Sequence, residues 1–158
     1  MKQDEQSSTD FSPDELDHAI LNALEEDSRL SYREIAKRLK KSPVTIINRI
    51  RAMEDAGIIK KYTVMLDHDQ LGFDITALIS LRISKGKLFA VEKKLADNPH
   101  VVALYDHTGE FDATIIGRFR NRRSMDAFLK RIQTYEFIER TRTQLVLNII
   151  KEDWGAAR

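Results

Sequence analysis

Hydrophobic residues recur at helical spacing in three short runs within the first sixty residues, which predicts three helices. The first two runs follow a serine with a glutamate three positions later, a pair that can satisfy free backbone groups at a helix start. This capping box predicts Ser12 and Ser31 as the N-caps, answered by Glu15 and Glu34. The third run follows Ser42-Pro43, runs to about residue 56 and stops at a glycine, as helices commonly do.

The third predicted helix has two chemically different faces when its residues are laid out at about 100° each. One side is apolar and should face a core: Ile46, Ile50 and Met53. The other side carries an amide, a guanidinium, a hydroxyl and a methyl-bearing side chain, groups suited to base edges in the major groove: Val44, Thr45, Asn48 and Arg51. Two short helices, a tight basic turn and this third helix predict a helix-turn-helix. Residues 58–64 read as a strand that would serve as a wing or a linker.

After a polar break at residues 67–72 the pattern alternates between strand and helix. The predicted order is a strand at 75–83, a helix at 87–96, strands at 101–105 and 113–119, a helix at 124–133 and a strand at 138–150. This βαββαβ order is typical of the ferredoxin-like fold, an antiparallel sheet with both helices on one face. The other face would be free to pair with a second subunit. Alternating Leu145, Leu147 and Ile149 indicate a buried face in the last strand.

The chain is therefore expected to be α+β, with a winged helix-turn-helix followed by a ferredoxin-like domain. The predicted boundaries are a flexible acidic tail at 1–12, the helix-turn-helix at 13–62, a linker at 63–72 and the second domain at 73–158.

Composition narrows the possible functions. The 158 residues are 42% hydrophobic, which suits packed domains, and they contain no cysteine, which excludes disulfide scaffolds, cysteine zinc sites and thiol catalysis. No apolar run approaches the roughly 18 residues that span a bilayer, and the polar N-terminus is not a secretory signal.

The net charge of +1 hides an uneven distribution. Residues 1–17 carry six anions and one cation, whereas residues 33–51 carry seven cations and one anion. An isolated run of this kind is usually a solvated helical face. Here it coincides with the predicted helix-turn-helix, which favours DNA binding. The residues expected to contact DNA are Arg33, Lys37, Arg38, Lys40, Lys41, Ser42, Val44, Thr45, Asn48, Arg49 and Arg51.

Two sets of motifs, in the same order, resemble the Lrp/AsnC family of transcription regulators. The N-terminal set comprises Leu16-Asp17, Ile20-Leu21, Asp27-x-Arg29-x-Ser31, Ile35-Ala36, Leu39, Ser42, Thr45-Ile46, Arg49-Ile50, Glu54 and Gly57-Ile58-Ile59. The C-terminal set comprises Tyr105, Thr108-Gly109-Glu110-Phe111-Asp112 and Thr141-x-Thr143. The resemblance covers about residue 14 to about residue 150.

The resemblance implies a cytoplasmic transcription factor that binds double-stranded DNA as a homodimer, associates further, often to octamers, and responds to a small effector, commonly an amino acid. Its second, RAM-type domain would mediate oligomerisation and bind the effector near the Gly109 loop, at the interface between subunits. By position, the effector-binding candidates are Tyr105, Thr108, Gly109, Glu110, Asp112, Thr141 and Thr143. Gly109 would let backbone N–H groups approach a carboxylate while Glu110 or Asp112 holds an ammonium group; alternatively, Gly109 only makes a turn and Asp112 only caps it.

Other functions remain open. Some proteins that resemble this family are tetrapyrrole (sirohaem-type) decarboxylases on the same two-domain scaffold, but the basic segment and the lack of paired catalytic residues argue against an enzyme. A third alternative is an architectural protein that wraps DNA without sequence preference. No cofactor or metal is expected, since a lone histidine such as His107 is more often structural than a ligand. A second basic cluster spans Arg118 to Arg123 and could be solvated, or contact acidic partners or wrapped DNA.

Overall fold

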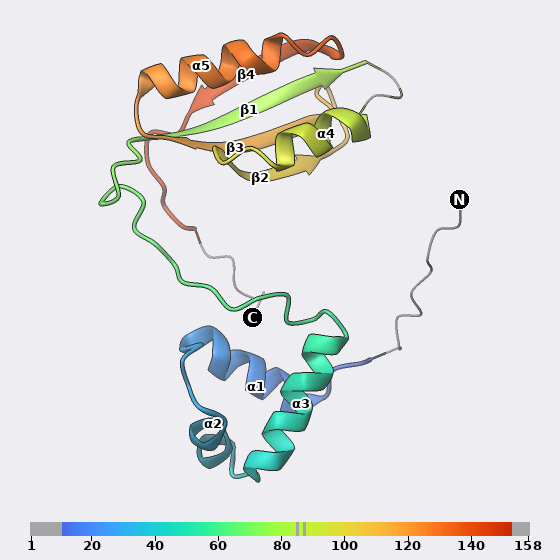
Figure 1. Ribbon diagram of the computed structural model, residues 1–158, viewed down its shortest axis with the longest axis vertical. Helices are drawn as coiled ribbons and strands as arrows, with labels where there is room; N and C mark the ends of the chain where they lie inside the picture. The colour runs from blue at the N-terminus through green and yellow to red at the C-terminus, as the bar shows by residue number, and fades with distance from the viewer. Residues whose placement is uncertain (1–10, 85, 87, 153–158) are drawn as a thin grey trace. The chain divides into compact units, whose positions relative to one another are not determined.

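The computed structural model describes residues 11–84, 86 and 88–152, and the chain divides into two compact units between Met65 and Leu66 (Figure 1). Residues 1–10 of the predicted acidic tail, and Lys87 at the predicted start of a helix, lie outside the described residues. Within that part of the chain, no helix is long and apolar enough to cross a bilayer.

The N-terminal unit contains three helices, α1 (Glu15–Glu26), α2 (Tyr32–Leu39) and α3 (Pro43–Asp55). Their inward side chains form one core, in which six residues are at most 2% exposed: Ile20, Ile35, Ala36, Ile46, Ile50 and Met53. The predicted inward face of α3 is therefore confirmed, and the helix-turn-helix brings α2 and α3 together as expected.

The helix starts agree with two of the three predicted caps. The Ser31 N–H donates to the Glu34 carboxylate at 2.7 Å, and the Ser42 hydroxyl accepts from the Thr45 N–H at 3.0 Å. The first cap is Asp14, not Ser12, so that prediction was wrong. The Asp14 carboxylate accepts the N–H groups of the first turn, and as an anion it is also stabilised by the positive end of the helix dipole.

The strand predicted at 58–64 is absent, and this segment is irregular. The backbone N–H groups of Ile58 and Ile59 donate to the Met53 carbonyl, so they close the end of α3. The Tyr62 hydroxyl donates to Glu54 at 2.8 Å. A strand also needs a neighbour to pair its backbone groups, and none of the described strands lies against this segment.

The C-terminal unit contains β1 (Ile75–Ile83), α4 (Leu88–Ala96), β2 (Val101–Asp106), β3 (Ala113–Phe119), α5 (Arg122–Gln133) and β4 (Ile138–Leu145). The strands form one antiparallel sheet in the order β2-β3-β1-β4 (Figure 1). This is the predicted βαββαβ arrangement. Side chains from α4, α5 and one face of the sheet share a buried core that includes Val91, Phe128 and Ile79.

Strand register separates the two faces of the sheet. Ala77, Ile79 and Leu81 on β1 are fully buried beneath the helices, whereas the alternate residues of β1 point to the face that no helix of this unit covers, here called the open face. β4 ends at Leu145, not at residue 150. It pairs with β1, which begins at Ile75, and the last hydrogen bond between the two segments runs from the Val146 N–H to the Thr76 carbonyl. Residues after Val146 therefore have no β1 backbone to pair with. Leu147 is 89% exposed, so the buried face predicted for the end of this strand was wrong.

Candidate functional site

The outer face of α3 is exposed and chemically varied. Val44 is 64% exposed. Asn48 and Arg51 lie on the same side of the helix as Val44, and both are exposed. The opposite side of α3 is fully buried at Ile46, Ile50 and Met53, so this rotational position of the helix is fixed by core packing. The three outward side chains are therefore presented on a rigid support.

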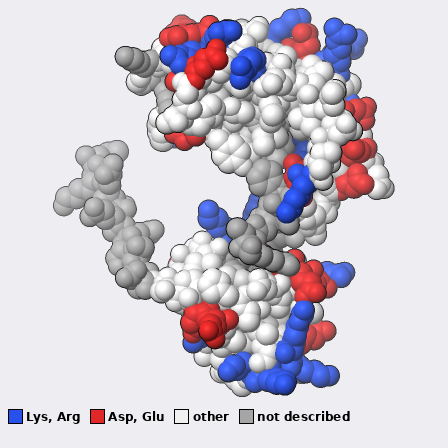
Figure 2. Space-filling model, turned by 180° about the vertical axis from the view of Figure 1, so that it is seen from behind, with Lys and Arg blue, Asp and Glu red and all other residues white. Residues whose placement is uncertain are grey.

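Basic residues gather around the turn that precedes α3. Lys40 adopts a left-handed conformation with φ 54°, and the Lys41 N–H donates to the Ala36 carbonyl at 2.9 Å, which makes the turn tight. Arg33 and Lys37 are exposed on α2 beside it. Figure 2 shows lysine and arginine side chains gathered at the lower end of the N-terminal unit. The tight turn thus places positive charge next to the start of α3.

Four predicted DNA contacts have partners inside the protein. One guanidinium nitrogen of Arg49, Nη1, lies 2.8 Å from Asp14 and 3.1 Å from Asp17, a fully buried carboxylate. Arg49 therefore ties α3 to the start of α1. Arg38 pairs with Glu26, but both side chains are more than half exposed. The Ser42 hydroxyl serves as the α3 cap and lies 2.8 Å from the Thr45 hydroxyl. Sequence reasoning missed Asp17, because no local pattern links residues 32 positions apart.

The loop between β2 and β3 holds most of the predicted effector residues. Gly109 has φ 128°, a conformation that glycine adopts without strain. The Glu110 carboxylate lies 3.3 Å from Arg140 and 3.9 Å from Arg142. The Asp112 carboxylate accepts the Ile83 N–H at 2.7 Å, so it secures the loop to the end of β1. Both carboxylates that were predicted to hold an ammonium group therefore have partners already.

A cavity of about 480 Å³ lies beside this loop, lined by Arg82, Gly109, Glu110, Phe111 and Arg140. Gly109 and Glu110 were predicted; the other three were not. The sequence contains one signal that could have pointed to Arg140: it stands two positions before Arg142 in a predicted strand, so the two arginines must lie on the same face of the sheet.

The remaining predicted residues do not line this cavity. Tyr105 is 48% exposed on β2, and Thr108 lies on the loop outside the lining residues. Thr141 and Thr143 are paired with Leu81 and Ile79, whose side chains face the helices. The two threonines are therefore on the face opposite Tyr105, and the structure does not bring the whole predicted set together.

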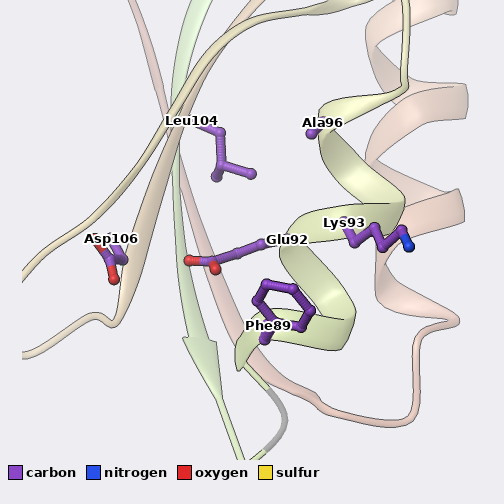
Figure 3. Close-up of a pocket in the computed structure, with 6 residues that line it drawn as sticks. All are labelled: Phe89, Glu92, Lys93, Ala96, Leu104 and Asp106. Atoms are coloured by element: carbon purple, nitrogen blue, oxygen red, sulfur yellow. The ribbon is translucent and has the colours of Figure 1, made fainter. Parts of the chain in front are cut away.

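A second cavity, of about 430 Å³, lies between α4 and β2 and was not predicted. Figure 3 shows the Glu92 side chain pointing from α4 toward Asp106 on β2, between Leu104 and Phe89. Burial raises the pKa of Glu92, and the nearby Asp106 charge raises it further. Phe89 is 80% exposed at the rim.

The second basic cluster is divided among different roles. Arg118 is only 6% exposed and pairs with Glu152. The Arg120 guanidinium stacks 4.7 Å from the Phe73 ring and donates to the Leu71 carbonyl. Arg122 and Arg123, at the start of α5, are exposed.

Comparison with known proteins gives a match to both units. Residues 13–60 match the family model for a winged helix-turn-helix DNA-binding domain, and residues 76–155 match the model for the Lrp/AsnC ligand binding domain. The chain is 44% identical over 141 residues to an uncharacterized HTH-type transcriptional regulator of Pyrococcus furiosus, an alignment that covers 89% of this chain and 95% of that protein.

Solved structures share the fold over nearly the whole chain. The AsnC protein of E. coli is 30% identical, with a TM-score of 0.83, and the match covers 90% of this chain and 97% of AsnC. A transcriptional regulator from Neisseria meningitidis, solved as a complex with L-Met, is 25% identical with a TM-score of 0.82, covering 92% and 97% of the two chains.

Proposed function

The chain belongs to the Lrp/AsnC family of DNA-binding transcriptional regulators, and from this premise we propose that it recognises specific DNA sequences through α3 and is controlled by a small effector such as an amino acid. The observation that carries the first half is the outward trio Val44, Asn48 and Arg51 on a helix whose opposite side is locked in the core. Amide and guanidinium groups can each make paired hydrogen bonds to base edges.

Around this trio, the exposed cations Arg33, Lys37, Lys40 and Lys41 would contact phosphates, with Arg38 available because its ion pair is exposed. The start of α3 adds a further anion-binding feature, since the positive end of the helix dipole favours a phosphate there. Arg49 is left out of this surface, because its charge is compensated by Asp14 and Asp17.

Homodimerisation would place two α3 helices in successive major grooves, so the operator should be roughly palindromic. Further association to an octamer is part of the same proposal. The regulator would act in the cytoplasm, on double-stranded DNA and without enzymatic activity.

The proposed effector site is the cavity beside the β2–β3 loop. It combines cationic side chains, a conformationally free glycine and a carboxylate, which together suit the two charges of an amino acid. The Neisseria regulator solved with L-Met supports this ligand class.

A gel shift on genomic fragments, repeated with a panel of amino acids and at several salt concentrations, tests the proposal. Asn48→Ala should relax sequence preference and spare non-specific binding, whereas Lys37→Ala should weaken binding to all sequences and reduce the salt slope by about one unit. If Asn48→Ala leaves sequence preference untouched, α3 does not read bases through this face. An equal shift of all fragments would instead indicate a DNA-wrapping protein. Binding of a tetrapyrrole without DNA binding would favour the decarboxylase.

A further inference from the structure

Three arginines lie together on the open face of the sheet. Arg82 on β1 is directly opposite Arg140 on β4, and Arg142 is opposite Ser80, two residues before Arg82. Since residues two apart on a strand share a face, the three guanidinium groups form one group, here called the arginine cluster. All three residues are exposed in the single chain.

Like charges directly opposite one another in a sheet repel, so the cluster needs compensation. Glu110 supplies most of it, with its carboxylate 3.3 Å from Arg140 and 3.9 Å from Arg142, while its carbonyl accepts from Arg82. Asp112 lies 3.8 Å from Arg82. Three cations face two anions, so the cluster keeps an excess of one positive charge.

Two of the three guanidinium groups, those of Arg140 and Arg142, lie over the ring of Phe111. Phe111 is only 3% exposed, and its ring lies 4.6 Å from the Arg142 guanidinium and 5.8 Å from that of Arg140. Stacking on a buried ring orients a planar guanidinium and leaves its edge free for a carboxylate. Arg140 and Arg142 therefore have a contact with Phe111 that does not depend on Glu110.

The Glu110 side chain is largely exposed to solvent. Its exposed fraction is 64%, and its partners Arg140 and Arg142 are 68% and 50% exposed. Exposed ion pairs of this kind contribute little stability. Glu110 also follows Gly109, whose φ of 128° is a backbone conformation that residues other than glycine rarely adopt.

We propose that the Glu110 carboxylate is an internal counter-ion that a carboxylate-bearing ligand displaces from the arginine cluster, after which Glu110 is free to bind the ammonium group of the same ligand. The proposal rests on the proposed effector function of this cavity and adds how the ligand is recognised. It assigns the ligand carboxylate to arginines instead of to backbone N–H groups of the loop, and it gives Glu110 two alternating partners.

Propionate and L-alanine are the probes, because they differ only in the ammonium group. Each is titrated into the full-length protein without DNA, and binding is followed by the guanidinium N–H resonances of Arg140 and Arg142 in NMR spectra. Glu110→Gln should bind propionate roughly two- to fivefold more tightly than the wild type, the worth of one or two exposed ion pairs. L-alanine should gain less than propionate from the same substitution, since the variant also loses the ammonium contact.

Glu136→Gln is the matched control, because it removes the same charge at an exposed position outside the cluster and the cavity. It should bind propionate like the wild type. Equal propionate affinity in Glu110→Gln and the wild type would overturn the proposal, as would the same resonance shifts with sodium chloride at matched ionic strength. The gel shift reads DNA binding and effector response, whereas this titration reads only the arginine cluster, so the two proposals can fail separately.

Discussion

Replacing Asp17 with alanine should destabilise the N-terminal unit far more than removing an exposed ion pair from the same unit. Asp17 is fully buried in α1, where one carboxylate oxygen accepts the Asp14 N–H at 3.0 Å and lies 3.1 Å from Arg49 on α3. The residue therefore completes the α1 cap and ties that cap to α3.

The magnitude follows from these two contacts. A hydrogen bond to a charged acceptor contributes about 1.5 kcal/mol. The ion pair between Asp17 and Arg49 contributes about 1 kcal/mol, well below the value for a fully buried pair. The reason is that Arg49 is 38% exposed and still has Asp14 as a partner once Asp17 is removed. The second Asp17 oxygen has no hydrogen-bond partner, and its removal offsets part of the loss. The net cost should be roughly 2 kcal/mol, which at about 1 kcal/mol per molar urea lowers the midpoint by about 2 M.

Urea unfolding of the full-length protein, followed through the amide resonance of Ile50, reports on this unit alone. Glu26→Gln is the control, since it removes the exposed pair with Arg38 and should cost less than about 1 kcal/mol. Arg49→Ala should cost at least as much as Asp17→Ala, because it leaves a buried carboxylate without its cation, and the double variant should cost less than the sum. Midpoints for Asp17→Ala and Glu26→Gln within about 0.5 M of each other would refute this account.

Two further substitutions test the C-terminal unit. Gly117→Ala would place a Cβ 2.9 Å from the ring of Phe119, which is fully buried and cannot move away, so urea titration should show a loss of about 1–3 kcal/mol. Glu92→Gln should raise the unfolding midpoint at pH 7, because burial and Asp106 raise the pKa of Glu92 and so penalise its charged form. Because the pKa of Glu92 is raised in the folded state, Glu92 does not lower the stability of the protein below its unfolded pKa of 4.5 and lowers it as the pH rises. The stability gained by Glu92→Gln should therefore vanish near pH 4. An equal gain at pH 4 and at pH 7 would contradict this reasoning.

The sequence predicts elements well where the interactions that form them are local. The caps at Ser31 and Ser42 and the inward face of α3 depend on residues within a few positions, and all three predictions agree with the structure. The strand predicted at 58–64 failed because β-structure depends on a partner elsewhere, however favourable the residues. β4 shows the same limit, since its length is set by where β1 begins and not by its own alternation of side chains.

The candidate sites were harder to predict than the fold, because residue type and spacing do not show which charges already have partners. Arg49 and Glu110 both have the chemistry expected of binding residues. In the structure Arg49 pairs with two aspartates at the start of α1, Asp14 at the cap and Asp17 within the helix, and Glu110 pairs with arginines of β4. The consequences differ because burial differs. The Asp17 side of the first contact is buried in the core, so that contact is structural, whereas the Glu110 contact is exposed on both sides, as the proposed exchange for a ligand requires.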